Sequence, residues 1–430
     1  MDLAHFSLKK GMLLGVATAA AQIEGGETGS SWHDWAASGH IKDGSTLARA
    51  DGHWERWRED TQLLADMGMQ TYRFGVEWSR VEPERGVFDE EVLARYRQEL
   101  SALRENGIDP LITLHHFTNP GWFEDMGAFA CRESTELYLR FVEKVVRSLG
   151  DLCAEYITIN EPNVYAFQGY ATGYWPPGKF DVGGLRAVLT NFVRCHTGAY
   201  TLIHRLRLEM GYTDTKVSFA DHLRVFDPKA RLNPWHRFLA QTADMGFQGS
   251  LTEAMMTGDC HFPVGDAGVP LGHYYDFIAI NYYSRSVIYR PANDSRPFSP
   301  KSDLEWEIYP QGIARLAAAM YKKYRAPIWI TENGTADSHD AFRCRYIFDH
   351  LRALCATDLP VERYYHWCFI DNFEWLEGES ARFGLVHIDY ETGERTIKKS
   401  GYFYSEIIEN GGVTEEMYRQ YVAGESYGIR

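Results

Sequence analysis

The feature of this sequence that most constrains its fold is a set of eight short apolar segments, rich in β-forming residues and separated by amphipathic stretches. Strands that alternate with helices in this way form βα units and a parallel sheet. The segments predicted to be strands are Leu13–Ala17, Thr71–Val76, Pro110–Leu114, Glu155–Ile159, Lys216–Ala220, Phe277–Ile280, Ile328–Thr331 and Arg363–Phe369.

Helical spacing of apolar residues marks the stretches between these strands. The predicted helices are His53–Met67, Glu90–Asn106, Ser134–Leu149, Leu185–Met210, Gln311–Tyr324 and Asp340–Ala356, with Asp89 and Glu133–Ser134 as start signals. Eight such units predict an α/β fold of the closed (β/α)8 TIM-barrel type, and a doubly wound open sheet is the alternative. Because no repeat or linker divides the sequence, residues 1–430 are predicted to form a single barrel domain.

Two predicted strands end in a glutamate next to an asparagine. Glu161 ends the first, in AEYITINEP, and Glu332 ends the second, in APIWITENG. Pro162 disfavours a helical backbone at Glu161, which predicts an extended conformation there. One such glutamate is as easily a solvated loop residue, but two facing carboxylates are the minimum equipment for glycoside hydrolysis. In a TIM barrel both would lie at the C-terminal ends of the strands, where active sites form.

These two stretches resemble the signatures of glycoside hydrolase family 1, the retaining β-glucosidase and β-galactosidase family. The signatures stand here as Thr158–Pro162 (TINEP) and Ile330–Gly334 (ITENG). The resemblance covers nearly the whole chain and continues through Gln22–Gly25, Tyr72–Arg80, His116, Asn281–Tyr283, Asp371–Trp375 and Arg382–Val386. It implies a barrel with its active site at the C-terminal strand ends and a reaction through a covalent glycosyl-enzyme intermediate.

The resemblance also implies roles for the residues around the two carboxylates. Glu161 would be the acid/base and Glu332 the nucleophile, held about 5 Å apart as in retaining enzymes. Arg73 is expected to keep Glu332 ionised, although a structural ion pair beneath the barrel mouth is the alternative for this arginine. Tyr283 would donate a hydrogen bond to Glu332, and Asn160 would hold the 2-hydroxyl of the sugar.

A sugar pocket and a leaving-group site follow from the same resemblance. The residues expected to bind the sugar are Gln22, His116, Asn160, Asn281, Glu374 and Trp375, with Trp367 as a stacking floor and Phe383 at the far side. The sequence departs from the family pattern mainly where the leaving group would lie. Phe117 stands where many members have Trp, and His222 stands where many have Asn. Trp306 resembles the aglycone-side Trp, with a packed core residue as the alternative.

Net charge and composition exclude several classes of function. A net charge of −15 argues against nucleic-acid binding, which needs a cationic surface. No apolar run reaches the length of a membrane span. Seven cysteines, an odd number without zinc-site spacing, fit neither a disulfide framework nor a structural metal, and they favour a reducing, cytoplasmic compartment.

Three local patterns suggest different functions. Lys9–Lys10 followed by Gly11–Ala21 resembles a signal peptide, but its apolar part is short and is interrupted, so we expect a retained barrel strand. Gly173–Phe180 has the glycine and lysine spacing of a phosphate-binding loop but lacks the metal-binding hydroxyl. His115–His116 cannot easily ligate one metal, because neighbouring strand residues point to opposite faces. No metal and no cofactor is expected.

The sequence thus predicts a cytoplasmic, exo-acting β-glucosidase with β-galactosidase or β-fucosidase side activity on small-molecule β-glycosides or oligosaccharides. A 6-phospho-β-glycosidase competes with this prediction, because the WPPG of Trp175–Gly178 also occurs among phospho-specific members. Glu374 argues against it, since a carboxylate facing a phosphate is repelled. The sequence is also compatible with a catalytically silent sugar-binding protein and with net transglycosylation. The Pro- and Ser-rich stretch Arg290–Asp303 is predicted to be a rim loop or an inert surface loop.

Overall fold

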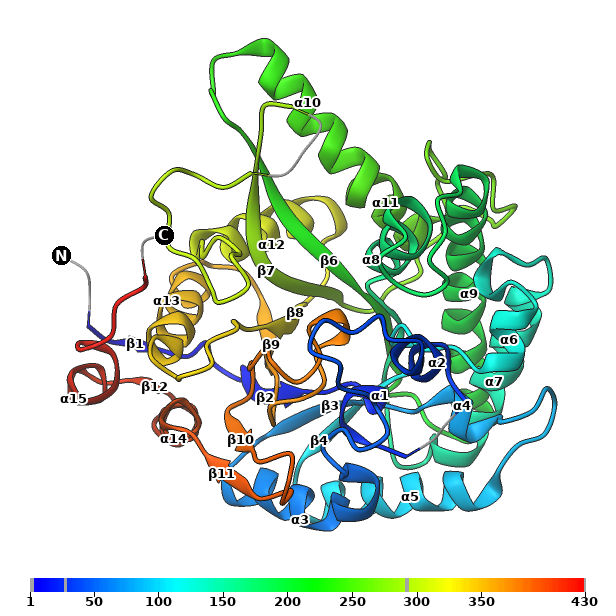
Figure 1. The fold of residues 1–430 in the computed structure, drawn as a ribbon, viewed down its shortest axis with the longest axis horizontal. Coiled ribbons are helices and arrows are strands. Elements are labelled where there is room, and N and C mark those ends of the chain that lie inside the picture. Colours follow the sequence, from blue (N-terminus) through cyan, green and yellow to red (C-terminus); the bar gives the residue numbers. More distant parts are fainter. Residues whose placement is uncertain (1–3, 27–28, 291–293, 429–430) are drawn as a thin grey trace.

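The computed structural model describes residues 4–26, 29–290 and 294–428. Eight parallel strands form a closed barrel in chain order, with the last strand paired to the first (Figure 1). The predicted (β/α)8 barrel is therefore confirmed, and the open doubly wound sheet is excluded. The barrel strands are β2 Leu13–Ala17, β3 Thr71–Gly75, β4 Asp109–Thr113, β5 Glu155–Asn160, β6 Lys216–Pro228, β7 Ile278–Ile288, β8 Ile328–Asn333 and β9 Val361–Trp367.

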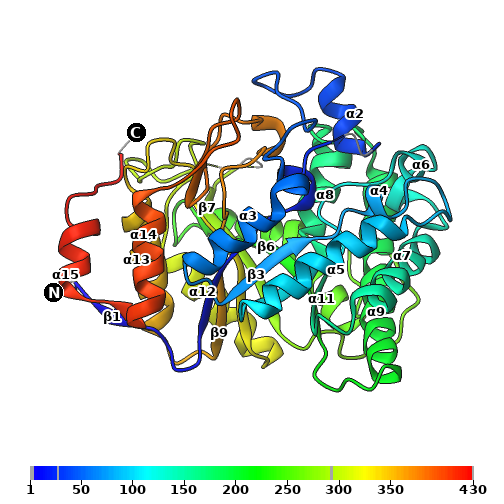
Figure 2. The same ribbon diagram turned by 90° about the horizontal axis from the view of Figure 1, so that it is seen from below.

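Helices cover the outside of the barrel. All six predicted helices are present, and those at Ser134–Leu149 and Gln311–Tyr324 have the predicted bounds. Figure 2 shows α3 and α5 crossing the near side, with α13 and α14 at one end and α7 and α9 at the other. The main helices are α3 His53–Asp66, α5 Glu90–Glu105, α7 Ser134–Leu149, α9 Val182–Glu209, α11 Ser250–Thr257, α12 Gln311–Tyr324, α13 Arg343–Cys355 and α14 Lys399–Asn410.

The barrel strands are buried on both faces, which explains their continuous apolar runs. Every residue of β3, β5 and β8 is buried. The segment that resembles a signal peptide contains β2, which pairs with both β3 and β9 and so closes the barrel. Only glycine fits at Gly15 of β2, because a Cβ there would lie 1.8 Å from the carbonyl oxygen of Thr71. Loss of this segment would open the barrel.

Two strands are much longer than predicted. The sequence predicted ends near Ala220 and Ile280, whereas β6 has 13 residues and β7 has 11, and the two remain paired as far as Pro228 and Ile288. The polar residues after Ala220 indicated a loop, but cross-strand hydrogen bonding continues beyond the barrel. In Figure 1 the extended pair reaches α10, Pro234–Asp244, which projects from the molecule and was not predicted.

Short elements form the rim and the ends of the chain. Near the rim lie α1 Ala20–Ile23, α2 Ser31–Ala37, α4 Trp78–Val81, α6 Gly121–Asp125, η1 Ala128–Ala130, α8 Pro162–Phe167, η2 Gln168–Thr172, η3 Met245–Gly249 and η4 Trp375–Glu377. Elsewhere lie β1 Phe6–Ser7, β10 Val386–Ile388, β11 Arg395–Ile397, β12 Gly412–Val413, α15 Glu415–Met417 and η5 Tyr418–Val422. Strand β1 pairs with β12, which joins the two ends of the chain. None of the helices in the described ranges is long and apolar enough to cross a membrane.

Candidate active site

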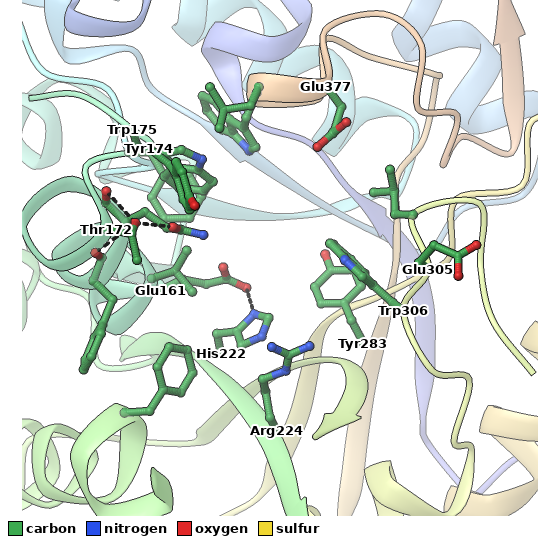
Figure 3. A pocket seen from close by; sticks show the side chains of 18 of the residues that line it. Glu161, Thr172, Tyr174, Trp175, His222, Arg224, Tyr283, Glu305, Trp306 and Glu377 are labelled. Carbon is green, nitrogen blue, oxygen red and sulfur yellow. Dashed lines mark hydrogen bonds and ion pairs between the residues drawn. The ribbon is translucent and has the colours of Figure 1, made fainter. Parts of the chain in front are cut away.

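A cavity of about 1110 Å³ opens at the C-terminal ends of the barrel strands, and both glutamates predicted from the sequence line it. Figure 3 shows the part of this cavity around Glu161, with Tyr283 and Trp306 on one side and Tyr174 and Trp175 on the other. Glu161 lies between the end of β5 and the start of α8, and Glu332 lies in β8. The fold therefore brings together two carboxyl groups that lie far apart in the sequence.

The backbone at Glu161 is left-handed, with φ 43° and ψ 58°, so the predicted extended conformation is wrong. Pro162 is the first residue of α8, and the chain must turn from strand to helix within one residue. Proline disfavours the right-handed helical region at the preceding residue, and the left-handed region gives the required turn. Residues other than glycine adopt this conformation uncommonly.

Glu332 is held by two donors and is only 3% exposed. The Arg73 guanidinium donates to Oε1 at 2.6 Å, and the Tyr283 hydroxyl donates to Oε2 at 2.6 Å. Arg73 also donates to the Thr331 carbonyl oxygen at 3.1 Å. Both contacts expected from the sequence, of Arg73 and of Tyr283 with Glu332, are present. Together they fix both carboxylate oxygens, and this orients the side chain.

Hydrogen bonds through two asparagines connect Glu332 to Glu161. The second nitrogen of Arg73 donates to Asn160 Oδ1 at 2.6 Å, and Asn281 Nδ2 donates to the same oxygen at 3.0 Å. Asn281 Nδ2 also donates to Glu161 Oε1 at 2.9 Å. The orientation of this amide is set by Thr331, whose hydroxyl donates to Asn281 Oδ1 at 2.7 Å. The two carboxyl groups are therefore parts of one buried network.

The two oxygens of Glu161 have different surroundings. Oε1 accepts from Asn281 and lies 3.0 Å from His222 Nδ1, the contact drawn as a dashed line to His222 in Figure 3. Oε2 has no partner among the residues that the structure describes. Because Oε1 already accepts a hydrogen bond, a proton on this carboxyl group belongs on Oε2.

Burial and neighbouring charges shift the protonation of the acidic groups. Burial raises the pKa of Glu332, Arg73 lowers it and the Glu161 charge raises it again, so that it lies at about 7. Arg73 therefore opposes the effect of burial without cancelling it, which limits the expectation that it keeps Glu332 ionised. Burial also raises the pKa of Glu374 to about 8, with a further contribution from the Glu332 charge.

Two buried polar atoms, one on the cavity-lining His116 and one on Gln22 next to Glu374, have no partner in the described part of the chain. Gln22 Nε2 donates to the Phe373 carbonyl oxygen at 2.7 Å, but Gln22 Oε1 is unpaired. Burial lowers the pKa of His116, so its ring is neutral. Its Nε2 accepts from Asn160 Nδ2 at 2.9 Å, which places the ring proton on Nδ1, and Nδ1 is unpaired too. Unpaired buried groups of this kind call for a polar ligand.

The remaining residues predicted to bind sugar surround these atoms. Glu374, Trp367 and Trp375 line the cavity. The Trp367 ring stacks on His116 with centroids 5.6 Å apart. Phe383 is 1% exposed and packs behind Tyr283 and Trp306, so it supports the wall from outside the cavity.

All three residues predicted for the leaving-group site line the outer part of the cavity. Phe117 packs edge-on against Trp175 and Trp375, at 4.8 and 5.2 Å between centroids. Trp306 and His222 both contact Tyr283. Arg290 and Asp303 also line the cavity, which favours the rim-loop prediction for that stretch, although 291–293 lie outside the described residues.

Sequence reasoning missed several lining residues. Val164 and Phe167 follow Glu161 on α8, and their place after a strand end could have indicated them. Trp175 lies in the stretch rejected as a phosphate loop. Arg224 lies on the unpredicted part of β6, and no signal in the sequence marked it. His115 points away from the cavity, toward Phe129 and Phe192, which agrees with the prediction of opposite faces.

Comparison with known proteins identifies the family. The model of the family described as glycosyl hydrolase family 1 matches residues 4–413. The chain belongs to glycosyl hydrolase family 1. Beta-glucosidase A of Acetivibrio thermocellus is 31% identical to this family 1 chain, over 95% of the chain and 100% of that protein.

Solved structures of family 1 proteins agree closely with this fold. The beta-glycosidase from Pyrococcus horikoshii has a TM-score of 0.88 and 32% identity, covering 98% of this chain and 99% of that one. The beta-glucosidase from Thermotoga maritima in complex with glucoimidazole has a TM-score of 0.87 and 29% identity, covering 94% of this chain and 99% of that one. This family 1 chain is therefore a retaining β-glycosidase.

Replacing Tyr283 by Phe is expected to move the acid limb of the pH profile for kcat/KM to higher pH. The Tyr283 hydrogen bond lowers the pKa of Glu332, so its removal raises that pKa, by roughly one unit for a bond to a charged group. A reaction that needs ionised Glu332 is lost as pH falls through this pKa, and the loss then begins at higher pH. The measurement is kcat/KM for an aryl β-glucoside across pH.

Tyr282→Phe is the matched control for this prediction. The Tyr282 hydroxyl donates to the Tyr309 carbonyl oxygen at 2.7 Å and does not contact Glu332. This variant should keep the wild-type acid limb even if its stability falls. Equal shifts in both variants would mean that the Tyr283 hydrogen bond does not set the titration.

Proposed function

We propose that this enzyme is an exo-acting β-glucosidase for neutral sugars, with side activity on β-galactosides and β-fucosides. Residues 1–430 would act as one catalytic domain. The observation that carries the proposal is the pair of carboxyl groups in one cavity with different surroundings. Glu332 is fixed through both oxygens, whereas Glu161 keeps Oε2 available.

In the first step Glu161 would act as acid and Glu332 as nucleophile. Glu161 donates the proton on Oε2 to the glycosidic oxygen while Glu332 attacks the anomeric carbon, which gives a covalent glycosyl-enzyme. Arg73 and Tyr283 hold Glu332 for this attack. Proton transfer lowers the basicity of the leaving oxygen as its bond breaks, so the leaving group departs as an alcohol.

In the second step Glu161 would act as base. Its carboxylate takes a proton from water as the water attacks the anomeric carbon, and Glu332 leaves. Two displacements on one carbon restore the original β configuration. The proton taken from water regenerates the acid form of Glu161, which returns the enzyme to its starting state.

The buried polar groups around Glu374 support exo action. His116 and Glu374 line the cavity and Gln22 donates to Glu374, and the unpaired atoms of Gln22 and His116 fit the hydroxyls of one terminal sugar. A buried site that bonds each hydroxyl rejects sugars that lack one, because polar groups are then left unpaired. We therefore propose that one non-reducing terminal residue enters at a time.

Glu332→Ala should remove nearly all turnover, and azide should restore part of it with an inverted, α-configured glycosyl azide. Glu161→Ala should keep the first step for substrates with good leaving groups, which need no proton, and azide should then give the β-configured product. Product configuration can be read by NMR. The roles would be refuted by azide products of the same configuration from both variants.

A neutral substrate is supported by the groups around Glu374. The sequence argument relied on a charged carboxylate at this position, but with a pKa of about 8 the group is mainly protonated at neutral pH. The like-charge repulsion then becomes complete only above that pH. The lysine that lines this cavity, Lys42, forms an ion pair with Glu377. Its charge is therefore already paired, which argues against a phosphate at this place. A phosphate would enter a cavity lined by five glutamates: Glu161, Glu305, Glu332, Glu374 and Glu377.

Above about pH 8, where Glu374 is ionised, an aryl β-glucoside should be hydrolysed with a kcat/KM roughly a hundredfold higher than that of its 6-phosphate, since opposed like charges cost several kcal/mol. Glu374→Ser should narrow this ratio mainly by slowing the neutral substrate. Glu379→Ser removes a charge from the same loop outside the cavity and should leave the ratio unchanged. A wild-type preference for the 6-phosphate would make the proposed role of Glu374 untenable.

We also propose that the enzyme works in the cytoplasm with residues 1–21 retained. All seven cysteines are free thiols, as suits a reducing compartment. Cleavage after Ala21 would remove β2, a barrel strand. Cell fractionation and the intact mass of protein purified from the native host should give a cytoplasmic chain that includes this segment. A secreted protein that begins near Gln22 would contradict the proposal.

A further inference from the structure

One face of the extended strand β6 forms a wall of the cavity beyond the catalytic pair. Residues of this strand alternate from Asp221 onward between buried and partly exposed. Three of the partly exposed residues, His222, Arg224 and Phe226, line the cavity. Alternate residues of a strand share one face. Along this face of β6 lie, in order, His222, which contacts Glu161, then the cation Arg224 and then the aromatic ring of Phe226.

Arg224 has no ion-pair or hydrogen-bond partner for its guanidinium among the residues that the structure describes. Its Nε is buried and unpaired. In Figure 3 the side chain rises from β6 toward His222 and Tyr283, and no dashed line reaches it. By contrast, Arg285 on the neighbouring strand β7 pairs with Glu307 and Asp227. The charge of Glu161 acts on Arg224 from nearby, but no acceptor among the described residues pairs with the guanidinium directly, and a partly buried cation in this state is unfavourable unless a ligand pairs with it.

The backbone around Arg224 is held in place, so the side chain is presented by a fixed support. The Arg224 amide donates to Gln248 Oε1 at 2.9 Å, and Gln248 Nε2 donates back to the Arg224 carbonyl oxygen at 3.0 Å. Gln248 belongs to η3, directly after α10. Gln248 Nε2 also donates to Asp244 Oδ1 at 2.6 Å, so this carboxylate at the end of α10 already accepts a hydrogen bond. Burial lowers the pKa of Arg224, and Tyr282 and Glu161 oppose this effect only in part.

We propose that Arg224 binds a carboxylate on the leaving group, so that the preferred substrates are β-glycosides of aromatic alcohols that carry a carboxylate. This inference rests on the proposed β-glucosidase function. A guanidinium matches a carboxylate through two parallel hydrogen bonds. A singly charged group suits this site, because the catalytic glutamates lie nearby and would repel a doubly charged one more strongly.

The spacing along β6 defines the size of the leaving group. His222 contacts Glu161, which protonates the leaving oxygen, and Arg224 lies two residues further along, about 6.6 Å at the usual rise of a strand. One aromatic ring spans such a distance between its oxygen and a ring carboxylate. The walls on either side are apolar, with Phe226, Phe247 and Ile288 among them. They suit the faces of an aromatic ring.

The test compares two substrates of nearly the same shape, one with a carboxylate and one with a neutral carboxamide: 3-carboxyphenyl β-glucoside and 3-carbamoylphenyl β-glucoside. Wild-type enzyme should prefer the carboxylate by roughly tenfold or more in kcat/KM, the size expected for hydrogen bonds between charged groups. Arg224→Gln should bring the ratio close to one. A general loss of activity or stability in this variant would slow both substrates equally and would leave the ratio interpretable.

Arg237→Gln is the matched control. Arg237 is an exposed arginine of α10 that does not line this cavity, so its removal should preserve the wild-type ratio. The proposal is overturned if wild-type enzyme hydrolyses the amide as fast as the carboxylate, or if Arg224→Gln keeps the preference.

A binding measurement separates this proposal from the proposed function. Calorimetric titration with 3-hydroxybenzoate and 3-hydroxybenzamide needs no turnover. Wild-type enzyme should bind the carboxylate more tightly, and Arg224→Gln should bind both equally. Absence of hydrolysis of phenyl β-glucoside would refute the β-glucosidase activity alone, whereas equal binding of the two ligands by wild-type enzyme would refute the role of Arg224.

Discussion

The active site depends on one buried cation, Arg73. This side chain is fully buried and donates hydrogen bonds to groups from three other barrel strands: the Thr113 hydroxyl on β4, Asn160 on β5, and Thr331 and Glu332 on β8. A charge so deep in a protein persists only when a counter-charge and hydrogen bonds compensate it. Glu332 supplies the counter-charge. The barrel thus brings the strand ends together, and Arg73 determines how their polar groups orient.

This network also specifies where protons lie. Arg73 occupies Asn160 Oδ1, so the Asn160 amide must donate to His116, and this fixes the neutral form of that ring. Thr331 orients Asn281, whose amide then donates to Glu161. A single cation therefore influences both His116, the proposed sugar-binding group, and Glu161, the proposed acid. Such preorganisation avoids reorientation of dipoles during the reaction.

The barrel and the two glutamates were predictable because both follow from local sequence. Buried strands give continuous apolar runs, and the paired strand-end motifs mark Glu161 and Glu332. The backbone at Glu161 was not predictable from Pro162 alone, because the abrupt turn from strand to helix decides among the conformations that proline leaves open. The length of β6 was missed for another reason. Beyond Ala220 it is held by pairing with β7, a non-local interaction that polar residues in the sequence conceal.

The extended part of β6 also couples the choice of leaving group to the position of Glu161. His222 contacts the carboxyl group of Glu161, and Arg224 stands two residues away on the same face of the strand. A shift of this strand would move both side chains together. A change near Arg224 would therefore also alter the contact between His222 and Glu161. Under the proposed role of Glu161 as acid, evolution of a new leaving-group preference would therefore alter the rate of proton transfer as well. Helix α10 contacts β6, so substitutions in α10 that shift this strand would also displace the side chain that contacts Glu161.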